Sequence, residues 1–499
     1  MKKVFIIGAG IGGLSIAARL LQYGFKVEIF EKNNTIGGKT NFIQYKNFKF
    51  DLTASIMMFP QNYIDLFLFC REDYRNYFTP IPINNLYNVF YSDNSIYTFN
   101  THLPTLNKTI SEITEGNIKD NYGYFEFLSN NYKKYLWAED SILNKSFLKT
   151  SNLLTSLTLP KVINLNAFAS SYDDAKKYIK NKKLLDYLMF QTMYVGISPY
   201  TSSSIYNIIP TVTQYYGLYH IKGGMYSYIA ALEKLVIKKG GIIHNSSPVH
   251  KILFKNNKAN GIVVNGQNHY SDVVVCSSDY SYTIKSLIKD SNVKDLIKPI
   301  NNLEYSCSTF ILYLGLDKKY PNLNLHNIYI NNELKENLKL TFDGFLPNDI
   351  SMYIYCPSSL DDTMCPKNCE AINVMVRVPN TLSNNVNWTS ETIYYFTKKT
   401  LKTLSSLRGL KDILEHIVYI NHLTPLDFKN KFNTYGGCAF GLSHTLKQSV
   451  IFRPQCQIPK IKNLFFTGAS IHPGNGVAMV LKSSKICASK INKMYMHNT

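Results

Sequence analysis

The sequence predicts an α/β protein in which a domain built on a parallel sheet is interleaved with a second domain of mixed sheet and helices. Strand-and-helix segments of the kind that build a parallel sheet occur at the start of the chain, near residue 223 and at its end. The stretches between them must then form the second domain. We therefore predict one discontinuous domain from residues 1–60, 217–290 and 440–499, and a second from residues 61–216 and 291–439.

The chain begins with a predicted βαβ unit. Residues 4–7 form a short apolar run bounded by Gly8, which is typical of a buried parallel strand. Residues 11–23 have helical periodicity and stop before Gly24, and residues 27–30 form a second strand. The first twenty residues resemble a signal peptide in composition, but glycines interrupt the apolar run and the second strand continues the pattern. We expect the N-terminus to lie inside the fold.

The remaining elements follow from the same periodicities. Residues 61–215 are predicted to be largely helical, and residues 391–416 to form one long amphipathic helix. Further helices are expected over 225–238 and 477–494, and strands over 242–244, 273–275, 309–314, 351–355, 372–378 and 464–466, with a hairpin-like run over 249–264.

Composition limits the classes of function. Hydrophobic residues make up 45% of the 499, which excludes a disordered chain, and no apolar run reaches the roughly 18 residues that span a bilayer. The formal charge of +20 indicates a polyanionic partner, but the basic residues are 48 Lys and only 6 Arg, without a cluster that reads bases. This excludes nucleic acid and leaves an anionic membrane surface. Nine scattered Cys predict reduced thiols in a cytoplasmic protein and no metal site.

The strongest motif is G-x-G-x-x-G at the first strand–helix turn. Gly8 permits the tight turn, Gly10 lets the backbone approach a pyrophosphate, and Gly13 lets the helix pack on the strand. Glu31, at the end of the second strand, is placed to accept a hydrogen bond from a ribose hydroxyl. The pattern predicts a Rossmann-like dinucleotide site. Its first members are Gly8, Ala9, Gly10, Gly12, Gly13 and Glu31.

Two further glycine turns favour FAD over NAD. Gly38 and Lys39 follow Glu31 closely and place a cation beside the phosphates. Gly476 and Val477 open the last helix, so a second helix N-terminus points at the same ligand, which suits a long cofactor with a ribityl chain. The alternative is that these glycines only cap a surface helix.

At this point the chain resembles the bacterial-type phytoene desaturases of the FAD-dependent amine oxidase-like superfamily. Within them it is most similar to those that act on the thirty-carbon precursor 4,4'-diapophytoene. The residues that carry the resemblance are 30–34, 37–38, 50–60, 190–197, 220–225, 305–308, 439–441 and 468–477. The resemblance implies an FAD-dependent oxidoreductase that acts on CH–CH bonds. Such an enzyme introduces conjugated double bonds into a linear carotenoid precursor, giving diaponeurosporene or diapolycopene.

The resemblance also implies which residues line the FAD. Beside the glycine motif, Gly38 and Lys39, they are Ser55, Val249 (through its backbone, at the adenine end), Gly468, Ala469, Gly476 and Val477. The chain departs from the family in two places. Lys39 stands where Arg is usual, which replaces a bidentate fork with a point charge. Thr53 and Ala54 replace Gly-Pro, so the turn near the flavin can differ.

No metal cluster, nucleophile elbow or carboxylate pair is present, so the sequence assigns no catalytic residue. The second domain would hold an isoprenoid hydrocarbon against the flavin, and residues 147–168 are either a membrane-docking surface or buried helices. Aromatic residues between 187 and 219 line a tunnel or form core, and core is favoured for any single one. Asp51, His220 and His472 are interpreted as structural polar residues. The protein would be cytoplasmic and peripherally membrane-associated, and its oligomeric state stays open.

Four rival functions remain to be weighed. A carotenoid end-group oxidase and a forty-carbon phytoene desaturase share the family's motifs, and their pigments would distinguish them. A non-enzymatic isoprenoid-lipid carrier of the same fold would be colourless without flavin, and the intact glycine motif argues against it. A small-amine oxidase, which would consume oxygen with amines, is disfavoured.

Overall fold

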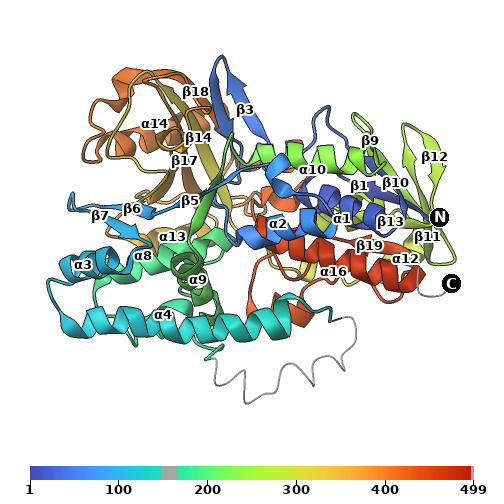
Figure 1. The fold of residues 1–499 in the computed structure, drawn as a ribbon, viewed down its shortest axis with the longest axis horizontal. Helices are drawn as coiled ribbons and strands as arrows, with labels where there is room; N and C mark the ends of the chain where they lie inside the picture. Colours follow the sequence, from blue (N-terminus) through green and yellow to red (C-terminus); the bar gives the residue numbers. More distant parts are fainter. Residues whose placement is uncertain (148–165, 496–499) are drawn as a thin grey trace.

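The computed structural model describes residues 1–147 and 166–495. Two lobes lie side by side in Figure 1. A five-stranded parallel sheet lies at the centre of the right lobe, and a seven-stranded mixed sheet lies in the left lobe. The long helix α4 (Ile118–Ala138) runs along the lower side of the molecule in this view. This arrangement confirms the predicted fold class.

The parallel sheet is assembled from three distant parts of the chain, in the strand order β19-β13-β1-β2-β9. From the central β1 the chain extends to β2 and β9 on one side and to β13 and β19 on the other. An open parallel sheet has its binding crevice at such a switch point, beyond the carboxyl ends of the strands. The strands are β1 (Lys3–Ile7), β2 (Lys26–Phe30), β9 (Ile242–His244), β13 (Val273–Cys276) and β19 (Leu464–Phe466).

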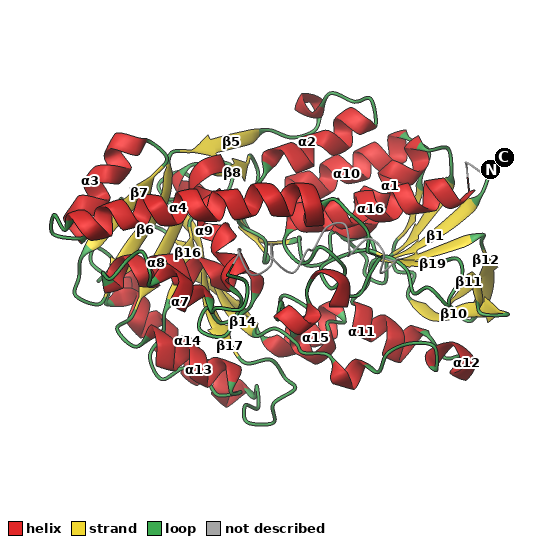
Figure 2. Ribbon diagram, turned by 90° about the horizontal axis from the view of Figure 1, so that it is seen from below, coloured by secondary structure: helices red, strands yellow, loops and turns green. Residues whose placement is uncertain are grey.

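Helices cover one face of this sheet and a small antiparallel sheet covers the other (Figure 2). Aliphatic side chains fill both layers, as the uninterrupted apolar strands require. The helices are α1 (Ile11–Gln22), α2 (Pro60–Phe69), α10 (Tyr226–Lys238) and α16 (Val477–Tyr495). The antiparallel strands are β10 (Val249–Lys255), β11 (Lys258–Val264) and β12 (Gln267–Tyr270).

The mixed sheet has the order β18-β14-β17-β16-β15-β6-β7, and only β15 and β6 run parallel. All nine residues of β14 are buried, because helices lie on both faces. The strands are β6 (Asn85–Tyr91), β7 (Ile96–Asn100), β14 (Ser308–Leu316), β15 (His326–Ile330), β16 (Met352–Tyr355), β17 (Glu370–Val378) and β18 (Ile417–Leu423). The covering helices are α3 (Leu103–Ile113), α4, α8 (Lys182–Thr192), α13 (Leu334–Phe342) and α14 (Ser390–Ser405).

Smaller elements connect the lobes. The hairpin strands are β3 (Phe42–Tyr45) with β4 (Phe48–Asp51), and β5 (Pro80–Ile83) pairs with β8 (Leu218–Ile221). The remaining α-helices of the described chain are α7 (Ser171–Ala175), α9 (Ile208–Tyr216), α11 (Tyr280–Tyr282), α12 (Ser291–Lys294) and α15 (Pro425–Phe432).

Two sequence predictions were wrong in detail. The segment 61–215 contains β5, β6 and β7 as well as helices, because the aromatic and β-branched residues of 85–100 pair as a hairpin at the edge of the mixed sheet. The long helix predicted over 391–416 ends at Ser405. Gly409, with φ of +85°, turns the chain there, and only a short 3₁₀ turn follows before β18.

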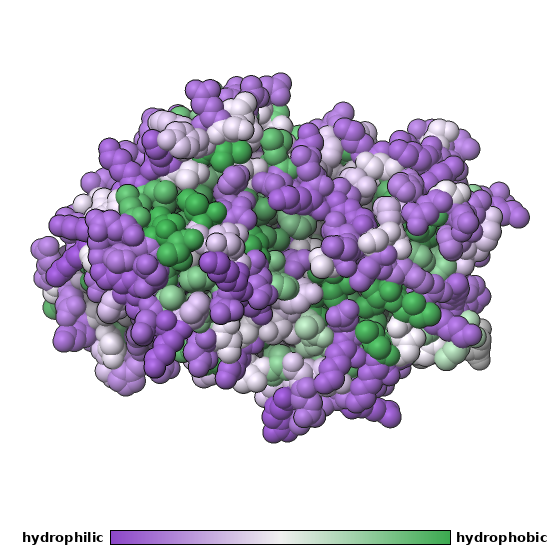
Figure 3. Space-filling model, turned by 90° about the horizontal axis from the view of Figure 1, so that it is seen from above, coloured by the Kyte–Doolittle hydropathy of each residue, from purple (hydrophilic) through white to green (hydrophobic). Residues whose placement is uncertain are grey.

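Among the residues described, no helix is long and apolar enough to cross a membrane. Polar side chains cover most of the face seen in Figure 3, and apolar side chains gather there in separate patches. All nine cysteines are free thiols, and eight of them are buried. In residues 1–147 and 166–495 no group of three or more His, Cys, Asp or Glu is placed to hold a metal ion.

Candidate functional site

The carboxyl ends of the parallel strands open into one large cavity. Gly8 follows β1, Glu31 follows β2, Ser277 follows β13 and Thr467 follows β19, and all four line it. The cavity has a volume of about 1170 Å³. It therefore lies at the switch point where an open sheet of this kind binds ligands.

The first glycine turn leaves an uncapped helix N-terminus in the cavity. Gly10 is the N-cap of α1 and no side chain caps its first turn, so the first N–H groups of the helix are free for a ligand. A Cβ built on Gly10 meets only the Gly37 carbonyl oxygen, at 3.9 Å, so the space beside it is open. A Cβ on Gly13 would lie 1.9 Å from the Gly8 oxygen, which shows why helix and strand require glycine there.

Glu31 holds the glycine turn against the second strand. Its carboxylate accepts a hydrogen bond from the Ala9 N–H at 2.9 Å and another from the Asn33 N–H at 3.0 Å. The side chain is buried and lines the cavity. Each carboxylate oxygen keeps a second lone pair, so Glu31 can still accept a hydrogen bond from a ribose hydroxyl.

The last glycine turn meets the first one. A Cβ on Gly12 would lie 3.6 Å from the Cα of Gly468, so the two ends of the chain touch at the cavity. Gly476 has φ of +89° and faces open space immediately before Val477 begins α16. The N-termini of α1 and α16 therefore open on the same cavity, as the sequence predicted.

Most predicted site residues line this single cavity. They are Gly8, Gly10, Gly12, Glu31, Gly38, Lys39, Ser55, Val249, Gly468, Ala469, Gly476 and Val477. Ala9 and Gly13 stand behind it, the first donating to Glu31 and the second packing α1 on β1. The Lys39 ammonium donates to the Ala439 carbonyl at 2.9 Å, and burial lowers the pKa of Lys39 against the opposing influence of Asp279.

The far part of the cavity is apolar. Its wall includes Met58, Tyr63, Ile142, Ile209, Val212 and Met479. Polar atoms without a hydrogen-bond partner among the described residues belong to residues that line the cavity: Arg377 Nε, Thr434 Oγ1, His444 Nδ1, His472 Nδ1 and Asn475 Oδ1. The open glycine cradles and free helix N-termini fit a bound dinucleotide, and the apolar part of the wall fits a hydrocarbon.

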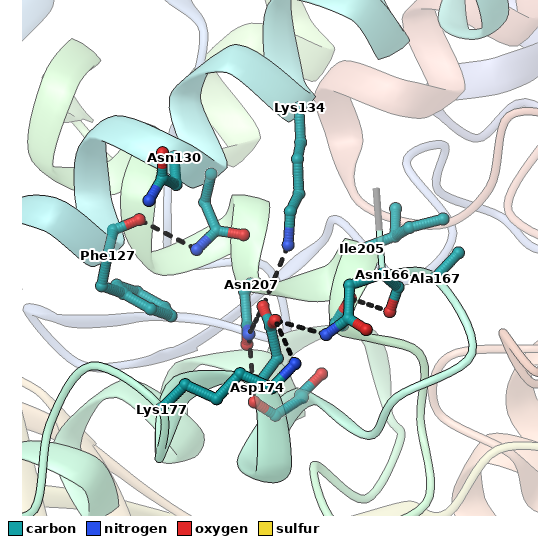
Figure 4. A network of polar contacts seen from close by, with 12 residues as sticks. Phe127, Asn130, Lys134, Asn166, Ala167, Asp174, Lys177, Ile205 and Asn207 are labelled. Atoms are coloured by element: carbon teal, nitrogen blue, oxygen red, sulfur yellow. Dashed lines mark hydrogen bonds and ion pairs between the residues drawn. The ribbon is translucent and has the colours of Figure 1, made fainter. Parts of the chain in front are cut away.

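The helical wall of the cavity is held by a buried ion pair (Figure 4). Lys134 Nζ on α4 lies 2.9 Å from Asp174 Oδ2 on α7, and their side chains are 10% and 3% exposed. Asn166 and Asn207 donate to the same carboxylate at 2.6 Å and 3.3 Å. Because Ala167, next to Asn166, lines the cavity, this network positions its wall.

His472 has the structural contact that the sequence favoured. Its Nε2 donates to the Ile142 carbonyl at 3.1 Å and so ties the last glycine turn to the π-helical turn Glu139–Leu143 that follows α4. Burial lowers the pKa of His472 to about 4, and it lowers the pKa of His444 well below the usual histidine range. Both imidazoles beside the cavity are therefore neutral near pH 7.

Asp51 and His220 belong to a second buried network behind the cavity wall. Asp51 accepts from the Met225 N–H at 2.8 Å and from the Tyr355 hydroxyl at 3.1 Å. His220 Nε2 lies 2.8 Å from Asp361 Oδ2. Burial raises the pKa of Asp51 to about 6, and nearby His220 and the two donors oppose the shift.

This shift predicts a pH dependence of stability. The Asp51 carboxyl of the unfolded chain loses its proton near pH 3.8, whereas the folded protein keeps it to about pH 6. As the pH rises from about 4 to 6, the free energy of unfolding should therefore fall by on the order of 3 kcal/mol from this group. Urea unfolding at several pH values should show the fall in the wild type and a flatter profile in Asp51→Asn. The exposed Asp140→Asn is the control, and an unchanged slope in Asp51→Asn would contradict the assignment.

Sequence reasoning missed Arg377 and Tyr353. They reach the cavity from the mixed sheet, whose placement depends on pairing between distant strands. Tyr194, one of the aromatic residues between 187 and 219 that were expected to line a tunnel or form core, lines the cavity from the turn after α8. One signal was available, since Arg377 is a charged residue in the apolar run 372–378. The docking surface predicted over 147–168 lies almost wholly outside the described residues; at its ends Phe147 is buried and Phe168 is exposed.

Comparison with known proteins supplies relatives and folds. The chain matches the family model described as flavin containing amine oxidoreductase over residues 11–492. It is 33% identical over 491 residues to a protein of Staphylococcus haemolyticus (strain JCSC1435), covering 97% of each chain. It is also 33% identical over 498 residues to a protein of Staphylococcus aureus (strain Newman), covering 98% of this chain and 99% of that one. Both relatives are named 4,4'-diapophytoene desaturase (4,4'-diaponeurosporene-forming).

Two solved structures show the same fold. An oxidoreductase from Methanosarcina mazei has a TM-score of 0.62 at 16% identity, with 97% of this chain and 99% of that chain covered. A putrescine oxidase double mutant has a TM-score of 0.65 at 12% identity, with 98% of each chain covered.

Proposed function

Because this chain belongs to the flavin containing amine oxidoreductase family, we propose that it introduces conjugated double bonds into 4,4'-diapophytoene, forming diaponeurosporene or diapolycopene. The protein is an FAD-dependent oxidoreductase. One observation carries the substrate proposal: a single cavity joins the two glycine turns to an apolar wall. A dinucleotide and a long hydrocarbon can therefore lie in direct contact inside one cavity, with no layer of solvent between them.

The glycine turns and the helix N-termini would hold the cofactor. The N–H groups at the start of α1 would bind the pyrophosphate, Glu31 a ribose hydroxyl, and the turn before Val477 the flavin end. When bound, FAD supplies an acceptor for the hydride that leaves the hydrocarbon. The remaining contribution of the chain is to orient the substrate and to exclude water.

The neutral histidines suit this chemistry. Loss of hydride leaves positive charge on the hydrocarbon, and loss of a proton to a neutral base then completes the double bond. A cation beside the hydrocarbon would oppose the first of these steps. His444 and His472 line the cavity, and burial keeps the pKa of each below neutrality. They therefore add no charge there near pH 7.

Pigment formation tests the proposal. The chain would be expressed in cells that make 4,4'-diapophytoene and in cells that make forty-carbon phytoene, and the products separated by chromatography. Yellow to red thirty-carbon products in the first strain are expected. Oxygenated products would indicate an end-group oxidase, colour only in the second strain a forty-carbon desaturase, and a colourless protein without flavin absorbance a lipid carrier.

We also propose that the cavity opens onto an anionic membrane surface, with the protein on the cytoplasmic side. Phe168 is 71% exposed and Phe452 is 62% exposed, and both line the cavity together with exposed Leu446 and Lys447. A hydrocarbon gains little by leaving lipid for an apolar cavity, so uptake requires the mouth to lie on the bilayer. The net charge of +20 adds attraction to anionic lipid.

The double variant Phe168→Ser/Phe452→Ser should bind anionic vesicles at least about tenfold more weakly than the wild type, because each ring contributes apolar burial in the interface. Co-sedimentation with vesicles of mixed neutral and anionic phospholipid measures this. Phe345→Ser removes an exposed ring from outside the cavity lining and is the matched control. Equal loss in the control and the double variant would contradict the assignment of the mouth.

A further inference from the structure

Arg377 is a cation that lines the cavity without an anionic partner. It lies on β17, and no ion pair joins it to an Asp or Glu within residues 1–147 and 166–495. Its Nη2 donates to the Met193 carbonyl at 3.3 Å, and its buried Nε–H has no acceptor. Desolvation lowers the pKa of Arg377, so its charged form is held in these surroundings with little compensation. A guanidinium of this kind is tolerated more readily where a bound ligand supplies the missing hydrogen-bond acceptors.

The surroundings of Arg377 are suited to an anion. The guanidinium lies over the ring of Phe440, 4.7 Å from its centroid. Tyr194 also lines the cavity. Its hydroxyl accepts a hydrogen bond from the Tyr87 hydroxyl, which leaves the proton of Tyr194 itself free for a ligand. Burial raises the pKa of Tyr194, so its hydroxyl keeps its proton. Two proton donors without acceptors therefore face the same cavity, which is the arrangement a carboxylate completes.

The rest of the cavity limits the ligand class. Its wall is mostly apolar and its volume is about 1170 Å³, far more than a small acid fills. The hydrocarbon of the proposed function offers no acceptor for either donor. A ligand with a long apolar chain and one carboxylate satisfies both parts of the cavity at once.

We propose that Arg377 and Tyr194 form a carboxylate-binding subsite, and that the protein binds long-chain isoprenoid carboxylic acids. Arg377 offers Nε–H and Nη–H as a planar fork to the two carboxylate oxygens, and Tyr194 donates a further hydrogen bond. The acid occupies the same cavity as the hydrocarbon and competes with it. This ligand class goes beyond the proposed desaturation, which needs no acidic group.

The test compares farnesoic acid with farnesol, which differ only in the charged group. Titration calorimetry on the FAD-loaded enzyme at pH 8 should show that the acid binds at least about tenfold more tightly. In Arg377→Met the acid should lose at least about tenfold in affinity, while farnesol changes by less than about twofold. Arg377→Lys should keep part of the preference, because it keeps the charge and loses the fork. Tyr194→Phe should reduce the affinity for the acid by a smaller factor.

The control is Arg408→Met, which removes an exposed arginine and should leave both affinities unchanged. Flavin absorbance of each variant reports cofactor content. Equal binding of acid and alcohol to the wild type would overturn the proposal. Loss of FAD in Arg377→Met with an unchanged preference for the acid would also overturn it, because the guanidinium would then pair with the cofactor. Pigment formation is scored separately, so failure of desaturation and failure of acid binding are distinguishable.

Discussion

Gly10→Ala is expected to fold like the wild type and to purify with less than about one tenth of its FAD. The methyl group meets no protein atom closer than 3.9 Å, so the folded chain accepts it. It projects where the backbone must approach a pyrophosphate, and it would hold the phosphates away from the free N–H groups of α1. Flavin absorbance per protein and a urea unfolding curve measure the two effects separately.

Gly13→Ala is the matched variant with a different expected result. Its methyl group would lie 1.9 Å from the Gly8 carbonyl oxygen, so α1 must move away from β1. Overpacking of this kind costs about 1–3 kcal/mol or more, and both stability and FAD content should fall. Full FAD content in Gly10→Ala would contradict the placement of the cofactor at this turn.

Asp174→Asn is expected to lower the free energy of unfolding by about 3–5 kcal/mol, because it leaves a buried ammonium without its carboxylate. Lys134, the partner, is 10% exposed and has no other carboxylate within ion-pair distance among the residues described. The cavity wall beside Asn166 should loosen, so substrate turnover should fall as well. Urea unfolding of the apo and FAD-loaded proteins measures the stability term.

Lys177→Met is the control for this carboxylate. Lys177 lies 3.9 Å from Asp174 Oδ1 but is 57% exposed, so its removal should cost less than about 1 kcal/mol. The double variant Lys134→Met/Asp174→Asn should be less destabilised than the sum of the two single variants, since it leaves no unpaired charge. A loss below about 1 kcal/mol in Asp174→Asn would refute the role assigned to the pair.

Local backbone demands made the first part of the site predictable. Gly13 must be glycine because a carbonyl oxygen lies where its side chain would be, and Gly476 favours glycine because its φ is positive. The presence of glycine in the sequence is therefore enough to indicate both backbone features. Arg377 could not be placed this way. It reaches the cavity through the pairing of β17 with β14 and β16, and antiparallel register between strands far apart in sequence leaves little local trace.

The same difference between local constraints and long-range strand pairing explains the two errors in the predicted secondary structure. The helical pattern of α14 continues in the sequence beyond Ser405, but the helix ends there with Ser406 as its C-cap, and Gly409 then turns the chain with a positive φ. The aromatic and asparagine-rich segment 85–100 has no strong period of its own. It becomes a hairpin because β15 offers an edge to pair with.

The strand order of the parallel sheet has a consequence for biogenesis. Since β19 and α16 leave the ribosome after the other strands of this sheet and the helices that cover it, a nascent chain cannot complete the crevice until these two elements have been synthesised. Until then, the strands already synthesised expose unpaired apolar edges. The many contacts between residues far apart in sequence also make completion of the sheet slow. A ligand bound between the first and last glycine turns would then stabilise the completed fold and so reduce aggregation of the newly made chain.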